Sequence, residues 1–156
     1  MISTDKDMKL RVYLDTSVFS AYYDHQEGER QILTLDFWSR FPEFEVATSE
    51  IAKEEMSKTQ DLNKRKKLLD LLTNFKIYPI TPEMEALADR YIKDGVFTIS
   101  MDLDALHVAA AVITRHDILV SWNFKHLVNR RRRARVNDIN TAIGIPTIDI
   151  VAPPEI

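Results

Sequence analysis

Acidic side chains stand beside short apolar segments at several distant places in this chain of 156 residues. Asp15 directly follows the apolar residues 12–14, and a carboxylate at the end of a buried strand is costly unless something pairs with it. Carboxylates that are packed together repel one another and stay ionised only when a cation lies among them. Oxygen ligands without His or Cys spacing suit Mg²⁺ or Mn²⁺, whose usual chemistry is hydrolysis or transfer at phosphorus.

Other oxygen ligands occur where a helix is expected to begin or a strand to end. Asp and Ser are also ordinary helix caps, and acids near helix N-termini are favoured by the dipole. This capping explanation is preferred for Glu50, Glu54 and Asp102, whereas Asp15 and Asp104 adjoin very apolar segments. The candidates are Asp15, Glu50, Glu54, Glu55, Asp102, Asp104 and Asn123.

Short apolar segments alternate with helical patterns along the chain, which predicts a parallel sheet covered on both faces in one domain, residues 1–156. Ligands bind such sheets at the carboxyl ends of the strands, so the candidate ligands are expected at one edge. Strands are expected at residues 12–14, 44–49, 76–80, 117–122 and 146–151. Helices are expected from about 17, over 29–41, from 51, over 62–75, 82–95 and 102–115, and ending near 144.

The composition excludes several classes of site. The chain has no cysteine, so disulfides, thiolate nucleophiles and Cys-based metal sites are excluded. Three glycines and no GxGxxG or P-loop pattern exclude a Gly-rich phosphate cradle. The N-terminus is polar, and the longest apolar run is too short to span a bilayer, so no membrane partner is expected. With a net charge of −3, contact with nucleic acid requires a local basic patch.

Four segments, in this order, resemble the motifs of the PIN-domain family of metal-dependent ribonucleases. They are YLDTSVFS, TSEIAKEEM, DALHVAAA and LVSWNFKHL. The first places an acid at the end of strand one, the second selects Glu55 by its register after the serine, and the third begins with Asp104. The fourth has Asn123 where the family carries Asp or Asn. The forms SWNFKH and DALH resemble a branch akin to VapC-type toxins.

The resemblance implies a three-layer α/β/α sandwich with a parallel sheet of about five strands, and an endoribonuclease that uses Mg²⁺ or Mn²⁺. Asp15, Glu55 and Asp104 would hold the metal, with Asn123 as the fourth catalytic position. Many relatives are cytoplasmic toxins that form dimers and pair with a small antitoxin. Because an amide adds no charge, Asn123 leaves open whether one or two metals act. The accessory candidates are Ser17, Asp102, as a substitute acid, and Ser121.

Some residues near these motifs have competing interpretations. His107 shares a helix face with Asp104, but its apolar neighbours favour a buried core histidine over a general base. Thr16 could bond Asp15 or cap a helix, and Trp122 could stack on a base or pack under the last helix. A basic run beside the proposed metal site is interpreted as a phosphate contact. It comprises Lys125, Arg130, Arg131, Arg132, Arg133 and Arg135.

Two other functions compete with a ribonuclease. A phosphatase of the HAD type also places an aspartate after strand one, but it needs a second Asp two residues later, where this chain has Ser17. A degenerate PIN module would bind RNA or a protein partner without cutting, and the missing charge at Asn123 keeps this alternative open.

Overall fold

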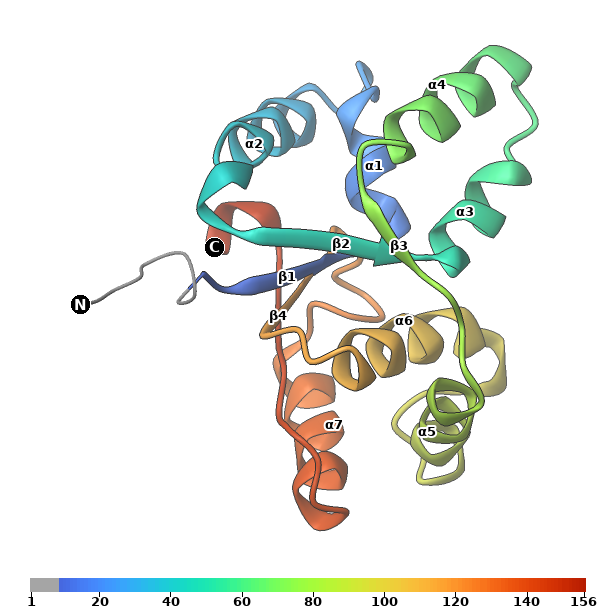
Figure 1. The fold of residues 1–156 in the computed structure, drawn as a ribbon, viewed down its shortest axis with the longest axis vertical. Helices are drawn as coiled ribbons and strands as arrows, with labels where there is room; N and C mark the ends of the chain where they lie inside the picture. Colours follow the sequence, from blue (N-terminus) through green and yellow to red (C-terminus); the bar gives the residue numbers. More distant parts are fainter. Residues whose placement is uncertain (1–8) are drawn as a thin grey trace.

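The computed structural model describes residues 9–156 and arranges five parallel strands in one sheet of order β3-β2-β1-β4-β5. The predicted parallel sheet is therefore confirmed, with β1 at its centre (Figure 1). No helix within residues 9–156 has the length and apolarity needed to cross a membrane. The strands are β1 (Arg11–Leu14), β2 (Glu45–Ser49), β3 (Lys76–Tyr78), β4 (Ile118–Val120) and β5 (Asp149–Val151).

Helices cover both faces of the sheet, as the three-layer prediction requires. Figure 1 shows the first four helices on one face and the last three on the other. This division follows from the crossovers, because parallel neighbours must be joined by a connection that passes over one face. The helices are α1 (Thr16–Tyr22), α2 (Gly28–Ser39), α3 (Glu50–Ser57), α4 (Leu62–Leu72), α5 (Pro82–Lys93), α6 (Asp102–Ile113) and α7 (Arg130–Ala142).

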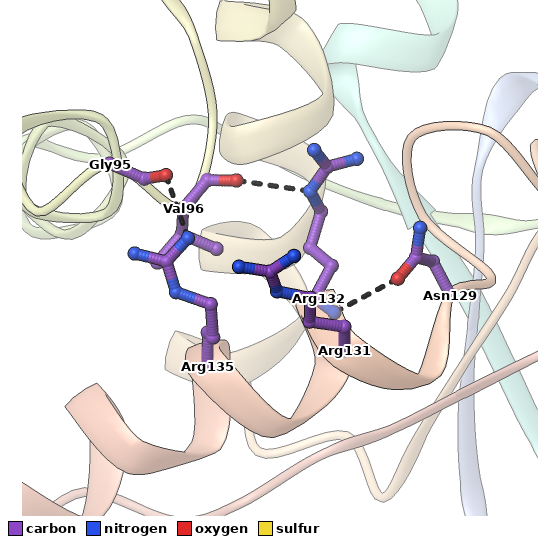
Figure 2. Close-up of a pocket in the computed structure, with 6 residues that line it drawn as sticks. All are labelled: Gly95, Val96, Asn129, Arg131, Arg132 and Arg135. Carbon is purple, nitrogen blue, oxygen red and sulfur yellow. Dashed lines mark hydrogen bonds between the residues drawn. The ribbon is translucent and has the colours of Figure 1, made fainter.

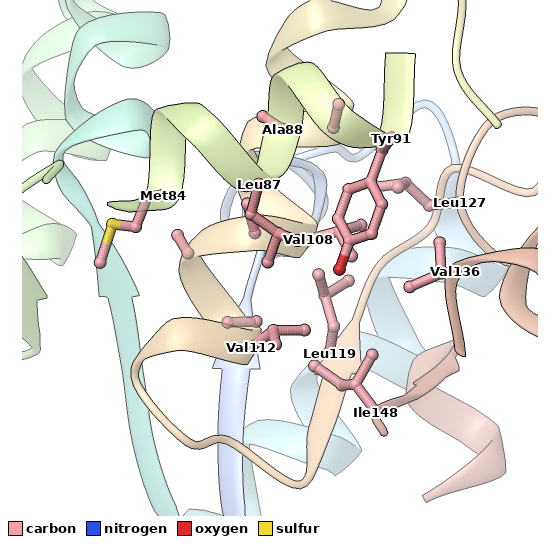
Figure 3. Packing of buried hydrophobic residues seen from close by; sticks show 14 of the residues in the cluster. Met84, Leu87, Ala88, Tyr91, Val108, Val112, Leu119, Leu127, Val136 and Ile148 are labelled. Atoms are coloured by element: carbon pink, nitrogen blue, oxygen red, sulfur yellow. The ribbon is translucent and has the colours of Figure 1, made fainter. Parts of the chain in front are cut away.

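Alternating side chains of β1 feed two separate apolar clusters. Val12 and Leu14 pack with the residues of α1 to α4, while Tyr13 belongs to the cluster formed with α5, α6 and α7. Figure 3 shows this second cluster. Successive side chains of a strand face opposite sides of a sheet, so β1 contributes buried side chains to both clusters. Burying one large apolar side chain stabilises the fold by about 1.5–3 kcal/mol. The acid that follows β1 is thereby fixed at the centre of the sheet edge.

Local sequence signals set several element ends. The Thr81 hydroxyl accepts a hydrogen bond from the Met84 amide, and Pro82 occupies the first helical position of α5. Gly95 follows the C-cap of α5 with φ +79°, a conformation that favours glycine. Helix α7 begins at Arg130 because the side chain of Asn129 accepts a hydrogen bond from the backbone amide of Arg132. The basic run therefore lies on the first turns of a helix.

A buried histidine lies at the opposite end of β1 from the acids. His116 is 4% exposed, and burial lowers its pKa to about 4. The positive charge of Arg11 lowers this pKa further, whereas Asp117 and Glu45 oppose the shift. His116 is therefore neutral in the folded protein at pH values where an exposed histidine already binds a proton.

Acid should destabilise the wild type partly through this residue. The folded pKa of His116 lies below its unfolded value near 6.5. Burial of the neutral ring therefore costs the folded state nothing above about pH 6.5, and the free energy of unfolding falls as the pH drops towards 4, because only the unfolded chain binds the proton. We expect the unfolding free energy of His116→Gln to fall less over this window, by up to about 3 kcal/mol. Urea titrations at several pH values measure the difference, and His25→Gln, at an exposed position, is the control. Parallel pH profiles for wild type and His116→Gln would contradict the prediction.

Candidate active site

The carboxylate of Asp15 is buried where β1 meets α1. Its side chain is 4% exposed and caps α1 by accepting from the Ser17 amide at 3.0 Å. The Ser17 hydroxyl donates to Oδ1 and the Ser121 hydroxyl donates to Oδ2, both at 2.6 Å. Burial raises the pKa of Asp15, Glu55 adds to this effect, and these hydrogen bonds and His107 oppose it. Asp15 thus has both a capping role and a desolvated carboxylate that a cation would stabilise.

Glu55 on α3 ends a chain of hydrogen bonds that begins on β2 and passes through β1 and α6. Ser49 lies 2.6 Å from the Tyr13 hydroxyl, which lies 2.7 Å from His107 Nδ1. His107 Nε2 donates to Glu55 Oε1 at 2.7 Å, and Thr16 donates to the same oxygen at 2.7 Å. Burial alone would raise the pKa of Glu55, but the bonds from His107 and Thr16 outweigh burial and lower it. Glu55 is consequently held ionised and in one orientation.

Asp104 on α6 is paired with a histidine from another segment. His126 Nδ1 donates to Asp104 Oδ2 at 2.9 Å, and the backbone amide of His126 donates to Asn123 Oδ1 at 2.9 Å. The Asn123 side chain thus closes a local turn, while its own amide donates to Ser121. His126 links the third and fourth motif positions in space.

Asp102 does not join these acids. It is exposed, its Oδ1 accepts from the Leu103 amide, and it borders a depression with Glu85 and Asp89 of α5. Side chains two positions apart on a helix do not face each other, so Asp102 and Asp104 point to different surroundings. Asp102 therefore lies apart from Asp104, and its role as a substitute acid stays a prediction.

The acids share the carboxyl edge of the sheet but are not gathered around one point. Among residues 9–156, no three or more His, Asp or Glu side chains are close enough to hold a metal ion. Glu55 and Asp104 instead hold hydrogen bonds with His107 and His126. The donor set itself fits Mg²⁺ or Mn²⁺, because it consists of carboxylate oxygens and includes the desolvated Asp15. A metal at this edge would compete with two histidines for its ligands.

Three arginines line one pocket of about 320 Å³ between the start of α7 and the loop after α5 (Figure 2). Arg132 Nε donates to the Val96 carbonyl, and Arg135 donates to the carbonyls of Gly95 and Asp94. Burial lowers the pKa of Arg132, Asp104 raises it, and the like charge of Arg135 lowers it again. The pocket therefore combines like charges and lies within electrostatic reach of Asp104. Its lining residues are Gly95, Val96, Asn129, Arg131, Arg132 and Arg135.

The basic run does not act as one surface. Arg133 turns to the other side of α7, where it donates to the Ile150 carbonyl and pairs with Asp149 at 3.3 Å. Lys125 borders a different depression, and Arg130 lines neither of these surfaces. Residues three or four apart share a helix face, which groups Arg131 with Arg135 and separates both from Arg133.

Several contacts at this edge are absent from the sequence interpretation. The Thr16 hydroxyl donates to Glu55, whereas the cap of α1 is Asp15. His107 is buried, as predicted, yet it also orients Glu55. Trp122 packs towards α2 instead of under the last helix, because its Nε1 donates to Thr34. The spacing of three residues between Asn123 and His126 is the one sequence signal that could have indicated their turn.

Comparison with known proteins agrees with the fold. The model of the PIN domain family matches residues 12–124. No curated protein matches the chain. The fold is similar to FitAcB from Neisseria gonorrhoeae, with a TM-score of 0.60 and 19% identity over 93% of this chain and 99% of that one. It is also similar to VapBC2 from Rickettsia felis, solved bound to a DNA fragment from its promoter, with a TM-score of 0.56 and 15% identity over 92% and 98%. A toxin–antitoxin complex from Klebsiella pneumoniae matches with a TM-score of 0.58 and 17% identity over 74% and 88%.

Proposed function

This chain belongs to the PIN-domain family, and we propose from that membership that it is an endoribonuclease that uses Mg²⁺ or Mn²⁺. The observation that carries the proposal is the desolvated carboxylate of Asp15 at the same sheet edge as Glu55 and Asp104. Three hydrogen bonds satisfy the oxygens of Asp15 but bring no positive charge, so a bound cation would stabilise its ionised form. The nearby arginine pocket supplies the opposite charge that an RNA strand requires.

The residues of this edge would divide the work of phosphodiester hydrolysis. Asp15, Glu55 and Asp104 would hold the ion, which when bound supplies an activated water and neutralises phosphate charge. His107 and Thr16 fix the Glu55 carboxylate and keep it ionised, so that it need not lose a proton before it acts as a ligand. Asn123 completes the edge as a neutral oxygen that shapes the turn holding His126.

The structural neighbours suggest a biological setting for this nuclease. Two of them are named as toxin–antitoxin structures, one being a member of the VapBC family from Mycobacterium tuberculosis. We propose that this chain is the toxin of such a pair, acts on RNA in the cytoplasm, binds a small antitoxin and forms a homodimer. Co-purification with the product of an adjacent small reading frame tests the partner, and sedimentation tests the dimer.

A cleavage assay tests the nuclease itself. We expect purified protein to cut single-stranded or structured RNA internally with Mg²⁺ or Mn²⁺, and to stop when EDTA is added. Glu54→Gln, an exposed change next to Glu55, should leave cleavage intact, whereas Glu55→Gln should abolish it. Cleavage by the purified protein that persists in EDTA, or that Glu55→Gln leaves as fast as in the wild type, would contradict the proposal.

A binding module that does not cut remains the second candidate. It is favoured by the Asn123 side chain, which carries no charge and is engaged in a local turn. This candidate predicts RNA binding that is equal with and without metal, and no cleavage at any metal concentration. Restoring the acid with Asn123→Asp would then be expected to produce cleavage if only this charge is missing.

A further inference from the structure

A second, more open depression lies beside the acids, on the side where Ser17 and Asn123 are. It has a volume of about 500 Å³ and adjoins Asp15 through Ser17, which donates to that carboxylate. The arginine pocket lies instead on the side of Asp104, because Arg132 donates to the His126 carbonyl and His126 donates to Asp104. The two depressions therefore flank the proposed metal site. This depression is lined by Ser17, Arg30, Trp122, Asn123, Phe124 and Lys125.

The floor of this depression is aromatic and cationic. Phe124 is 48% exposed and meets Trp122 edge to face, with ring centroids 6.1 Å apart. The guanidinium of Arg30 lies 5.2 Å from the Trp122 ring and 5.7 Å from the Phe124 ring. No ion pair within residues 9–156 uses Arg30. An exposed ring beside a positive charge is the surface on which the bases of a single strand stack.

Trp122, the ring that Phe124 meets, is anchored by two hydrogen bonds. Trp122 is 6% exposed, its Nε1 donates to Thr34 at 2.8 Å, and its amide donates to the Ser17 hydroxyl at 2.8 Å. Ser17 in turn donates to Asp15, so the aromatic floor and the candidate metal ligand share one hydrogen-bond network. A ligand on Phe124 would thereby lie beside a ring that is joined to Asp15 through Ser17.

We propose that Phe124, with Arg30 beside it, is the stacking site for an unpaired base of the RNA, next to the phosphate that is cut. The proposal rests on the RNA substrate of the proposed function and adds where that substrate is gripped. An unpaired base is the occupant that fits, because a base within a duplex is already stacked on both faces. The site would favour single-stranded segments over duplexes and would tolerate different bases, because every base has a π-face.

Base removal without loss of a phosphate provides the test. In EDTA, where no strand is cut, the wild type is titrated with a short single-stranded RNA and with copies that carry one abasic position each. We expect one abasic position to weaken binding about 5- to 150-fold, the range of one base–aromatic stack. Phe124→Ala should bind the intact strand with the same loss and show no further loss at that position. Phe124→Tyr should restore the wild-type pattern, and Leu62→Ala, at another exposed apolar side chain, should leave it unchanged.

A fluorescence measurement locates the base independently. In a Trp38→Phe background Trp122 is the single tryptophan, and its emission should change when the intact strand binds but not with the copy abasic at the critical position. A flat abasic scan, or equal losses for wild type and Phe124→Ala, would overturn the stacking site even if RNA is cut. If Phe124→Ala instead changes only self-association, the ring is a contact between copies. Binding that follows the stacking pattern without any metal-dependent cleavage would support this site and contradict the nuclease.

Discussion

Asp15→Asn is expected to abolish RNA cleavage and, in EDTA at neutral pH, to raise the melting temperature. Loss of a ligand that carries several kcal/mol of transition-state stabilisation lowers the rate about a thousand-fold or more. Stability should change in the opposite direction, because burial raises the pKa of Asp15 and its ionised form is costly in the folded state. Each kcal/mol relieved raises the melting temperature by about 2–4 °C in a domain of this size.

The sign of this effect depends on pH. The folded pKa of Asp15 lies above the unfolded value near 3.9, so its stabilisation is complete below that value and is lost as the pH rises through the folded pKa. The advantage of Asp15→Asn should therefore vanish in acid. An amide preserves the cap, since its oxygen still accepts from Ser17 and its amino group can donate to the Ser121 hydroxyl.

Metal linkage provides a second measurement on the same pair of proteins. A metal that binds only the folded wild type at 100 times its dissociation constant adds about 2.7 kcal/mol of stability. Mg²⁺ or Mn²⁺ should thus raise the melting temperature of the wild type and leave Asp15→Asn nearly unchanged. A variant that melts lower than wild type in EDTA at neutral pH would show that Asp15 serves mainly as the cap of α1.

The sequence predicts the sheet and the edge because both follow from short-range patterns. Residues 12–14 are apolar and followed at once by an acid, and Thr81-Pro82 and Gly95 mark the ends of α5. Alternation of strands and helices then implies parallel pairing, which brings Asp15 and Asp104 to one edge. None of these inferences needs the position of a distant side chain.

Contacts between distant segments could not be predicted in the same way. The pairing of Asp104 with His126 depends on how the turn after β4 folds, and Trp122 reaches Thr34 only through the packing of α2. The position of Asp102 depends on helical phase, which separates its side chain from that of Asp104 once the start of α6 is known. The basic run is the same case, since treating it as one patch ignores its phase on α7.

That phase makes a sharp prediction about RNA affinity. The double change Arg131→Ala and Arg135→Ala removes two guanidinium groups from the pocket near Asp104, whereas Arg130→Ala and Arg133→Ala removes the same charge from other surfaces of α7. If the pocket binds phosphates, the first pair should weaken RNA binding about 100-fold near 50 mM salt and reduce the salt slope by about 1.4, at about 0.7 per contact.

Because the two double variants remove the same charge, comparing them separates direct phosphate contact in the pocket from the overall positive charge of α7. Arg133 already donates to the Ile150 carbonyl and pairs with Asp149, so its loss should lower stability more than RNA affinity. Binding titrations from 50 to 400 mM salt measure both slopes, and metal affinity should be unaffected, because none of these side chains is a candidate ligand. Equal losses for the two pairs would mean that RNA senses only the net charge of α7. An unchanged slope in the first pair would assign the pocket to solvent, and the RNA strand would then have to approach Asp15 from the side of Phe124 alone.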